Sequence, residues 1–227
     1  MDIKGQIAVV TGAGSGLGRA LAIELAKRGA SVALIGRRAD RLQETQSLIE
    51  KAGGKSKAWP RDVSISVDVE SVIHEIALEW GPIDILINNA AVFPENSTVE
   101  EMEISDWDET QATNLRGPFL MCRAVLPSMK DRNYGRILNI SAPIKHYPGA
   151  SGYCSSKSAL DSLTKAMAFE NKENKIRINA VEPPFLNTEM HTGGPEPETV
   201  VDEILEWVSP SEELKSGRIH KIKSSAG

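Results

Sequence analysis

Residues 11 to 18 read TGAGSGLG, from Thr11 to Gly18, and this stretch decides the fold. It follows the apolar run at 7–10 and opens a segment whose leucines at 17, 21 and 25 share one helical face. The glycines therefore lie where a buried strand turns into a helix. Backbone without Cβ atoms admits a phosphate closely, and the N–H groups at the start of the helix stabilise its charge. The pattern predicts that a dinucleotide pyrophosphate is held by Gly12, Ser15, Gly16, Leu17 and Gly18. A glycine-rich turn without a ligand is the alternative.

Apolar strands and amphipathic helices alternate along the chain, which is typical of a parallel sheet covered on both faces. We expect strands at 6–10, 31–35, 55–59, 83–88, 135–141, 176–182 and 217–222, and helices at 16–28, 39–52, 66–80, 106–131, 152–170 and 198–208. The sequence therefore predicts one α/β domain over residues 1–227, a Rossmann fold with a doubly wound, parallel, seven-stranded sheet. Ligands of such sheets bind at the switch point, here beside the first and fourth strands.

Composition excludes several classes of partner. The net charge of −5 and the pI near 5.5 argue against nucleic acid, which calls for a basic face. No apolar run approaches the length of a membrane span, and the first residues lack the pattern of a secretory signal. Two cysteines, Cys122 and Cys154, give no disulfide framework. We expect a cytoplasmic protein with no metal site.

The end of the second strand indicates which dinucleotide binds. An acidic residue there would accept hydrogen bonds from the adenine ribose, but this chain has Gly36 followed by Arg37 and Arg38. A guanidinium fork suits a 2′-phosphate, so Arg37 favours NADP over NAD. The alternative is that both arginines simply begin an exposed helix.

Two other strand ends fit a cofactor groove. Asp62 and Val63 follow the third strand, where the carboxylate is suited to the adenine amino group. Asn89 and Ala90 end the fourth strand, where small side chains let a ribose lie against the backbone. Each pair is also compatible with an ordinary turn.

Tyr153 and Lys157 are four residues apart in a helical pattern, so both side chains are directed to one space. A nearby cation favours phenolate and lowers the pKa of a phenol from its usual value near 10. The pair is thus suited to acid/base catalysis at a carbonyl.

Taken together, these motifs resemble the classical short-chain dehydrogenase/reductase family. The matching residues run in order along almost the whole chain: Thr11 to Gly18, Asp62-Val63, Asn88-Asn89-Ala90, Asn114, Asn139-Ile140-Ser141, Tyr153, Lys157, Pro183 and Thr188. The resemblance implies that Tyr153 exchanges a proton with the substrate oxygen, that Lys157 binds the nicotinamide ribose, and that Asn114 holds a water in a proton relay. It also implies that Pro183 and Thr188 contact the nicotinamide end, and that the helices at 106–131 and 152–170 form a homodimer or homotetramer.

The chain departs from the family at the serine that contacts the substrate oxygen. The strand ends Ser141-Ala142-Pro143, and the loop before Tyr153 is two residues short. Register puts Ala142 at the serine position, whereas a slip would bring Ser141 into the site as the catalytic serine. His146 and Tyr147 are alternative donors in the shortened loop, or are a solvated and a packing residue.

Three functions remain in competition. The first is an NADP-dependent oxidoreductase that transfers a hydride between nicotinamide and a small carbonyl or secondary-alcohol substrate. The second is an NADP-binding regulatory or scaffolding homologue with impaired chemistry, suggested by Ala142. The third, an epimerase or dehydratase, usually needs a larger carboxyl-terminal domain. The Gly/Pro-rich segment 191–197 is either a mobile lid or a surface connector.

Overall fold

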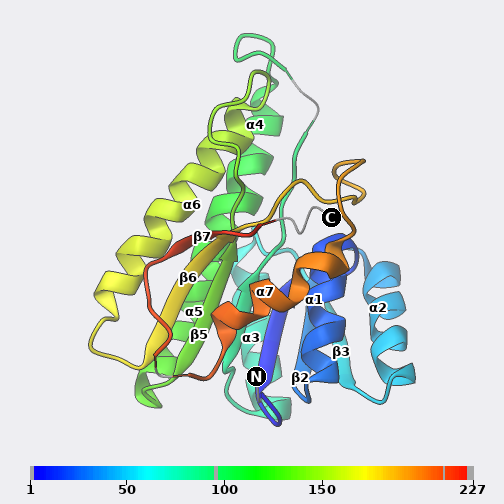
Figure 1. The fold of residues 1–227 in the computed structure, drawn as a ribbon, viewed down its shortest axis with the longest axis vertical. Coiled ribbons are helices and arrows are strands. Elements are labelled where there is room, and N and C mark those ends of the chain that lie inside the picture. The colour runs from blue at the N-terminus through cyan, green and yellow to red at the C-terminus, as the bar shows by residue number, and fades with distance from the viewer. Residues whose placement is uncertain (1–2, 95–96, 212, 224–227) are drawn as a thin grey trace.

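The computed structural model describes residues 3–94, 97–211 and 213–223, and it contains one parallel sheet (Figure 1). Its strands lie in the order β3-β2-β1-β4-β5-β6-β7. They are β1 Ile7–Thr11, β2 Ser31–Gly36, β3 Lys55–Pro60, β4 Ile85–Asn88, β5 Gly135–Ile140, β6 Ile176–Glu182 and β7 Ile219–Lys221. The predicted Rossmann fold with a seven-stranded, doubly wound sheet is confirmed. Residues 1–2 and 224–227, which the predicted domain includes, lie outside the described residues.

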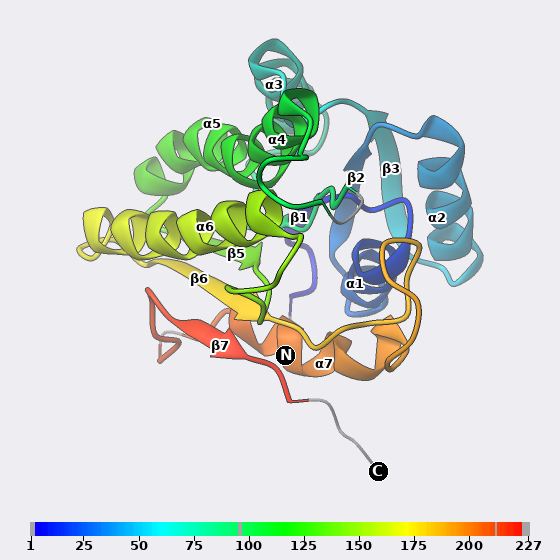
Figure 2. The ribbon, with the colours of Figure 1, turned by 90° about the horizontal axis from the view of Figure 1, so that it is seen from above.

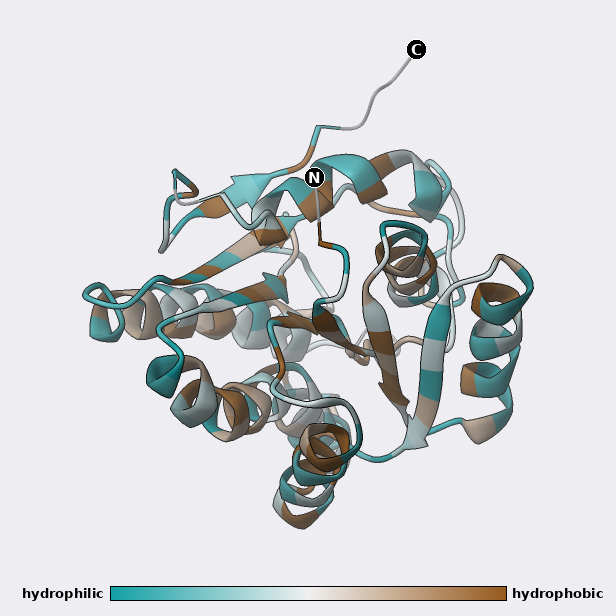
Figure 3. Ribbon diagram, turned by 90° about the horizontal axis from the view of Figure 1, so that it is seen from below, coloured by the Kyte–Doolittle hydropathy of each residue, from teal (hydrophilic) through white to brown (hydrophobic). Residues whose placement is uncertain are grey.

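Helices cover both faces of this sheet (Figure 2). On one face lie α1 Gly16–Lys27, α2 Ala39–Lys51 and α7 Val201–Leu205. On the other lie α3 Ser66–Trp80, α4 Ile104–Gln111, α5 Gly117–Asp131 and α6 Ser151–Glu170. The central strands are therefore apolar on both sides, as the brown strands of Figure 3 show. In β1, Ala8 and Val10 pack into the first core while Ile7 and Val9 pack into the second.

The long helix predicted at 106–131 is wrong in detail, because it is interrupted. Between α4 and α5 the backbone forms a π-helical turn, η1 Ala112–Arg116. Pro118 lacks the N–H that would bond the carbonyl of Asn114 in a regular helix, which accounts for the wider turn. The turn leaves the Asn114 side chain fully buried.

The carboxyl-terminal elements are shorter than predicted. The expected helix at 198–208 is a five-residue α7 flanked by the 3₁₀ turns η2 Pro197–Val200 and η3 Glu206–Val208. It ends before Pro210, which disfavours helix at the preceding residue. The strand expected at 217–222 pairs with β6 over three residues only. Within the described ranges, none of the helices is both long and apolar enough to span a membrane.

The chain reverses its winding direction between β1 and β4. β1 pairs in parallel with β2 on one side and with β4 on the other. The loops that follow these two strands consequently lead to opposite faces of the sheet. Their separation leaves a crevice at the carboxyl ends, where parallel sheets of this kind bind ligands.

Candidate active site

A cavity of about 630 Å³ lies at the carboxyl ends of the strands, a volume typical of a cofactor or small-molecule site. The structure brings nearly all of the sequence-predicted site residues to its wall: Gly12, Ser15, Gly16, Leu17, Arg37, Asp62, Val63, Asn89, Ala90, Ser141, Tyr153, Lys157, Pro183 and Thr188. Gly18 and Asn114 lie behind the wall. One groove therefore connects the glycine-rich turn to the Tyr153–Lys157 pair.

Glycine is required at two places in the turn between β1 and α1. Gly12 has a φ of +65°, and a Cβ there would lie 2.9 Å from the Cα of Ala90. A Cβ on Gly18 would lie 2.2 Å from the carbonyl oxygen of Gly12 and 2.5 Å from Asn89 Nδ2. Gly18 thus lets α1 begin close against the turn, while Gly12 lines the cavity. The result is a backbone cradle of the kind that accepts a pyrophosphate.

Thr11 fixes the two sides of the switch point together, a role that the sequence analysis missed. Its Oγ1 accepts hydrogen bonds from the backbone N–H groups of Asn89, at 2.9 Å, and Ala90, at 3.0 Å. Asn89 Nδ2 donates in return to the Thr11 carbonyl at 3.0 Å. These bonds hold the end of β4 against the end of β1. A threonine that begins the glycine-rich stretch was the available signal.

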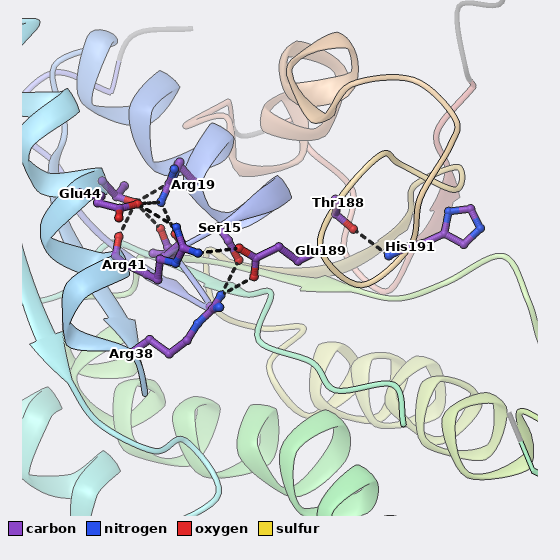
Figure 4. A network of polar contacts seen from close by, with 12 residues as sticks. Ser15, Arg19, Arg38, Arg41, Glu44, Thr188, Glu189 and His191 are labelled. Carbon is purple, nitrogen blue, oxygen red and sulfur yellow. Dashed lines mark hydrogen bonds and ion pairs between the residues drawn. The ribbon is translucent and has the colours of Figure 1, made fainter. Parts of the chain in front are cut away.

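The arginines at the far end of the groove are paired with carboxylates (Figure 4). Arg38 Nη2 donates to Ser15 Oγ at 3.0 Å and to Glu189 Oε2 at 2.7 Å. Arg41 Nη2 lies 3.6 Å from Glu189 Oε1. Arg37, the residue predicted to bind a 2′-phosphate, forms an exposed ion pair with Glu109 at 2.9 Å. A phosphate entering here meets several guanidinium groups but also competes with two carboxylates.

The segment after β6 folds back against the glycine-rich turn. Thr188 lies so close to Gly16 that a Cβ at residue 16 would be 3.1 Å from Thr188 Cγ2. Thr188 Oγ1 also accepts a hydrogen bond from the His191 N–H (Figure 4). The Asn187 N–H donates to the Pro195 carbonyl, which closes the Gly/Pro-rich loop on itself. This loop is exposed yet internally bonded, and Glu189 ties it to Arg38.

Tyr153 and Lys157 lie together on α6, with Lys157 Nζ 5.7 Å from the centre of the Tyr153 ring. Phe93 packs against the same ring at 4.9 Å between centroids. Burial raises the pKa of Tyr153 to about 12, opposite to the lowering that the sequence predicted. The reason is that desolvation of the phenolate exceeds any help from Lys157, whose ammonium donates to the Ile140 carbonyl at 2.7 Å. Burial, and then the positive charge of Lys145, lower the pKa of Lys157 to about 8.

Asn114 supports this pair from behind the cavity wall. Its Oδ1 accepts from the Val92 N–H at 2.8 Å, while its Nδ2 donates to the Val92 carbonyl at 2.9 Å and to Ser156 Oγ at 3.2 Å. The side chain therefore clamps the strand end beyond β4 to α6. This places Phe93 against Tyr153, which sequence spacing could not reveal.

Two residues after β5 are candidates for the serine position. β5 ends at Ile140, and both Ser141 and Ala142, which follow it, line the cavity. The placing of Ala142 at the family's serine position by register, and of Ser141 as the catalytic serine by a slip, both stay predictions. Ser141 Oγ accepts a hydrogen bond from Lys145 Nζ at 3.0 Å. His146 and Tyr147 are exposed and lie outside the cavity wall.

Known proteins resemble this chain over most of its length. A model of the short chain dehydrogenase family matches residues 6–198. A 3beta-hydroxysteroid dehydrogenase from Mediterraneibacter gnavus is 38% identical over 185 residues, covering 81% of this chain and 67% of that protein. A gluconate 5-dehydrogenase from Gluconobacter oxydans is 37% identical over 191 residues, covering 83% and 74%.

Solved structures agree with this assignment. A metagenomic short-chain oxidoreductase crystallised in complex with NADP superposes with a TM-score of 0.88 at 28% identity, covering 98% of this chain and 99% of that one. The sheet order is that of the predicted Rossmann fold. The chain therefore belongs to the short-chain dehydrogenase/reductase family and is an NAD(P)-dependent oxidoreductase.

Proposed function

We propose that the protein uses NADPH to reduce the carbonyl group of a small molecule to an alcohol, and catalyses the reverse oxidation with NADP. The observation that carries this proposal is one cavity with a glycine cradle and arginines at one end and a buried tyrosine–lysine pair at the other. The cavity volume and the cradle fit a dinucleotide. When bound, the nicotinamide supplies or accepts the hydride.

The chain's own residues would hold that cofactor along the groove. Gly12, Ser15, Gly16 and Leu17 line the groove beside the start of α1, where backbone N–H groups would bind the pyrophosphate. The Ser64 N–H and Oγ donate to Asp62 Oδ1 at 2.9 and 2.7 Å and hold the carboxylate, which would bind the adenine amino group. Val63, Asn89, Ala90, Pro183 and Thr188 line the remaining wall.

Arg37 and Arg38 support a preference for NADP over NAD. Both line the cavity beside Gly36, which stands at the end of β2 in place of the acidic residue that would bind the adenine ribose of NAD. A 2′-phosphate carries more charge than a carboxylate and is bound well by guanidinium forks. We therefore expect it to displace Glu109 from Arg37 and Glu189 from Arg38.

The protonation state of Tyr153 supports reduction at neutral pH. With a pKa of about 12 the phenol keeps its proton and can donate it to a substrate oxygen that gains negative charge. Lys157 would bind the nicotinamide ribose, and its ammonium would stabilise the phenolate that remains after proton transfer. Ser141 also lines the cavity, and its hydroxyl would serve as a second donor to the same substrate oxygen.

We also propose that copies of the chain associate through α4, α5 and α6, the helices at 106–131 and 152–170 named on sequence grounds, in a homodimer or homotetramer. Ile104, Trp107 and Phe119 are 77%, 40% and 46% exposed on these helices, an amount of apolar surface typical of an interface. Met121, on α5, is fully buried and belongs to the core. Light scattering tests the oligomeric state. We also keep a cytoplasmic location as part of the proposed function.

The function is tested with NADPH and a panel of aldehydes, cyclic ketones and 3-oxo esters. Tyr153→Phe removes the proton donor, so turnover is expected to fall by about 10²- to 10⁴-fold while NADPH binding, followed by its fluorescence, persists. Tyr147→Phe changes an exposed tyrosine outside the cavity and serves as the matched control. NADPH binding without turnover of any carbonyl would favour the regulatory or scaffolding alternative, for which Ala142 is the motivating observation.

A further inference from the structure

Lys145 lies behind the cavity wall at Ser141, in the shortened loop between β5 and α6. Its Nζ donates to Ser141 Oγ at 3.0 Å and forms ion pairs with Asp161 Oδ2 at 2.7 Å and Glu182 Oε1 at 3.2 Å. The three charged side chains, here named the Lys145 cluster, are 22%, 15% and 16% exposed. None of the three lines the cavity. The hydrogen bond from Lys145 to Ser141 therefore connects the cluster to the cavity wall.

Lys145 and Lys157 bracket the end of β5. Lys157 donates to the Ile140 carbonyl, and Lys145 bonds to the next side chain, Ser141. Asp161 is four residues beyond Lys157 on the same face of α6, and its carboxylate forms the ion pair with Lys145. The charge on Lys145 opposes protonation of Lys157, whereas Asp161 favours it.

The hydrogen bond from Lys145 also decides what the serine hydroxyl can do. The oxygen is occupied as an acceptor, and among the described residues the hydroxyl proton is donated to no protein atom. A hydroxyl whose oxygen accepts a hydrogen bond from a cation is polarised, and its own O–H group becomes a stronger hydrogen-bond donor. The proton of Ser141 thus has no acceptor among the described protein atoms, and Ser141 is one of the residues that line the cavity.

We propose that Lys145 is a positioning residue of the proton-transfer centre. Its ammonium holds the Ser141 hydroxyl at the cavity wall with the proton free for a substrate oxygen, and it adds a second positive charge beside Lys157. Asp161 and Glu182 hold the ammonium in place by ion pairs from α6 and β6. The proposal deepens the carbonyl reduction proposed above and rests on it for its effect on turnover.

The pH dependence of reduction separates this role from structural support. The titratable groups around Lys157 are Tyr153 and Asp161 on α6, Lys145 in the preceding loop and Glu182 on β6. Lys145→Met removes a like charge, so the descending limb of the pH–rate profile is expected to move to higher pH. Asp161→Asn removes an opposite charge and moves the limb to lower pH. Lys145→Arg keeps the charge and leaves the limb near its original position.

The size of the effect tests the link to Ser141. Lys145→Met is expected to lower kcat about 10-fold, by analogy with the loss of an outer hydrogen-bond partner of a metal ligand. Ser141→Ala lowers it as well, and adding Lys145→Met to Ser141→Ala costs little more, because the two act through one hydroxyl.

Arg132→Met is the matched control. It breaks the ion pair between Arg132 and Asp84, whose side chains are 28% and 17% exposed and so are buried to a similar degree. Asp84 comes just before β4, and the pair lies far from the cavity. It should lower the unfolding temperature without moving the pH limb.

A titration that needs no substrate completes the test. In protein carrying ¹³Cε-labelled lysine, with the Lys157 signal assigned by Lys157→Met, NMR follows its pKa in each variant. A rise with Lys145→Met and a fall with Asp161→Asn support the proposal. An unmoved signal, or additive kcat losses for Ser141→Ala and Lys145→Met, would overturn it. If the wild type reduces no carbonyl, the proposed function fails, while the direction of the Lys157 shifts still supports or overturns the proposed role of Lys145.

Discussion

The two ends of the cavity use the same arrangement in different surroundings. At the cofactor end, Arg38 bonds to a serine, Ser15, and to a carboxylate, Glu189, with both charged side chains about half exposed. At the catalytic end, Lys145 bonds to Ser141 and to the carboxylates of the Lys145 cluster, each less than a quarter exposed. Water screens the first network and little reaches the second. We infer that a phosphate can displace Glu189 from Arg38, whereas the ion pairs of the Lys145 cluster persist when ligands bind.

The largest difference is expected in stability. Asp161→Asn removes one of the two carboxylates paired with Lys145, while Glu182 stays. The three side chains are 22%, 15% and 16% exposed, so the expected loss lies between those of an exposed and a buried ion pair, about 2 kcal/mol. Urea unfolding of the variant should therefore show a clearly lower midpoint with an unchanged slope. A loss below ~1 kcal/mol would place the enclosed network in the same class as the exposed one.

The pH dependence of the wild type gives the next largest effect. Reduction requires the Tyr153 phenol, which persists up to a pKa of about 12, and the Lys157 ammonium, which is lost above its pKa of about 8. The kcat for NADPH-dependent reduction should be flat near neutrality and fall about tenfold per pH unit well above 8. A profile that stays flat to pH 10 contradicts the role assigned to the Lys157 charge.

The smallest effect concerns the cofactor end. Glu189→Gln removes a carboxylate from the arginines, so NADPH should bind about 2- to 5-fold more tightly, equivalent to an exposed ion pair. NADH, which lacks the 2′-phosphate, should gain less. Glu70→Gln, which breaks the exposed Arg123 pair on α3 and α5, is the control and should change neither affinity. Weaker NADPH binding in Glu189→Gln would show that the carboxylate assists the cofactor rather than competing with it.

Sequence patterns predicted the parts of the site that depend on local structure. The glycine-rich turn, the strand ends and the Tyr153–Lys157 pair each follow from spacing along one or two elements. The Lys145 cluster could not be predicted, because its members come from a loop, a helix and a strand that only the folded sheet brings together. The direction of the Tyr153 pKa shift also escaped prediction, since burial depends on packing by residues such as Phe93.

The most direct measurement is a crystal structure with NADP bound. Carbonyl reduction by Tyr153, with Ser141 held by Lys145, predicts that both hydroxyl oxygens lie within about 2.6–3.2 Å of one point beside the nicotinamide. It also predicts the 2′-phosphate on Arg37 and Arg38, with Glu189 displaced. A Ser141 hydroxyl turned away from that point, or an adenosine end bound elsewhere, would contradict the account.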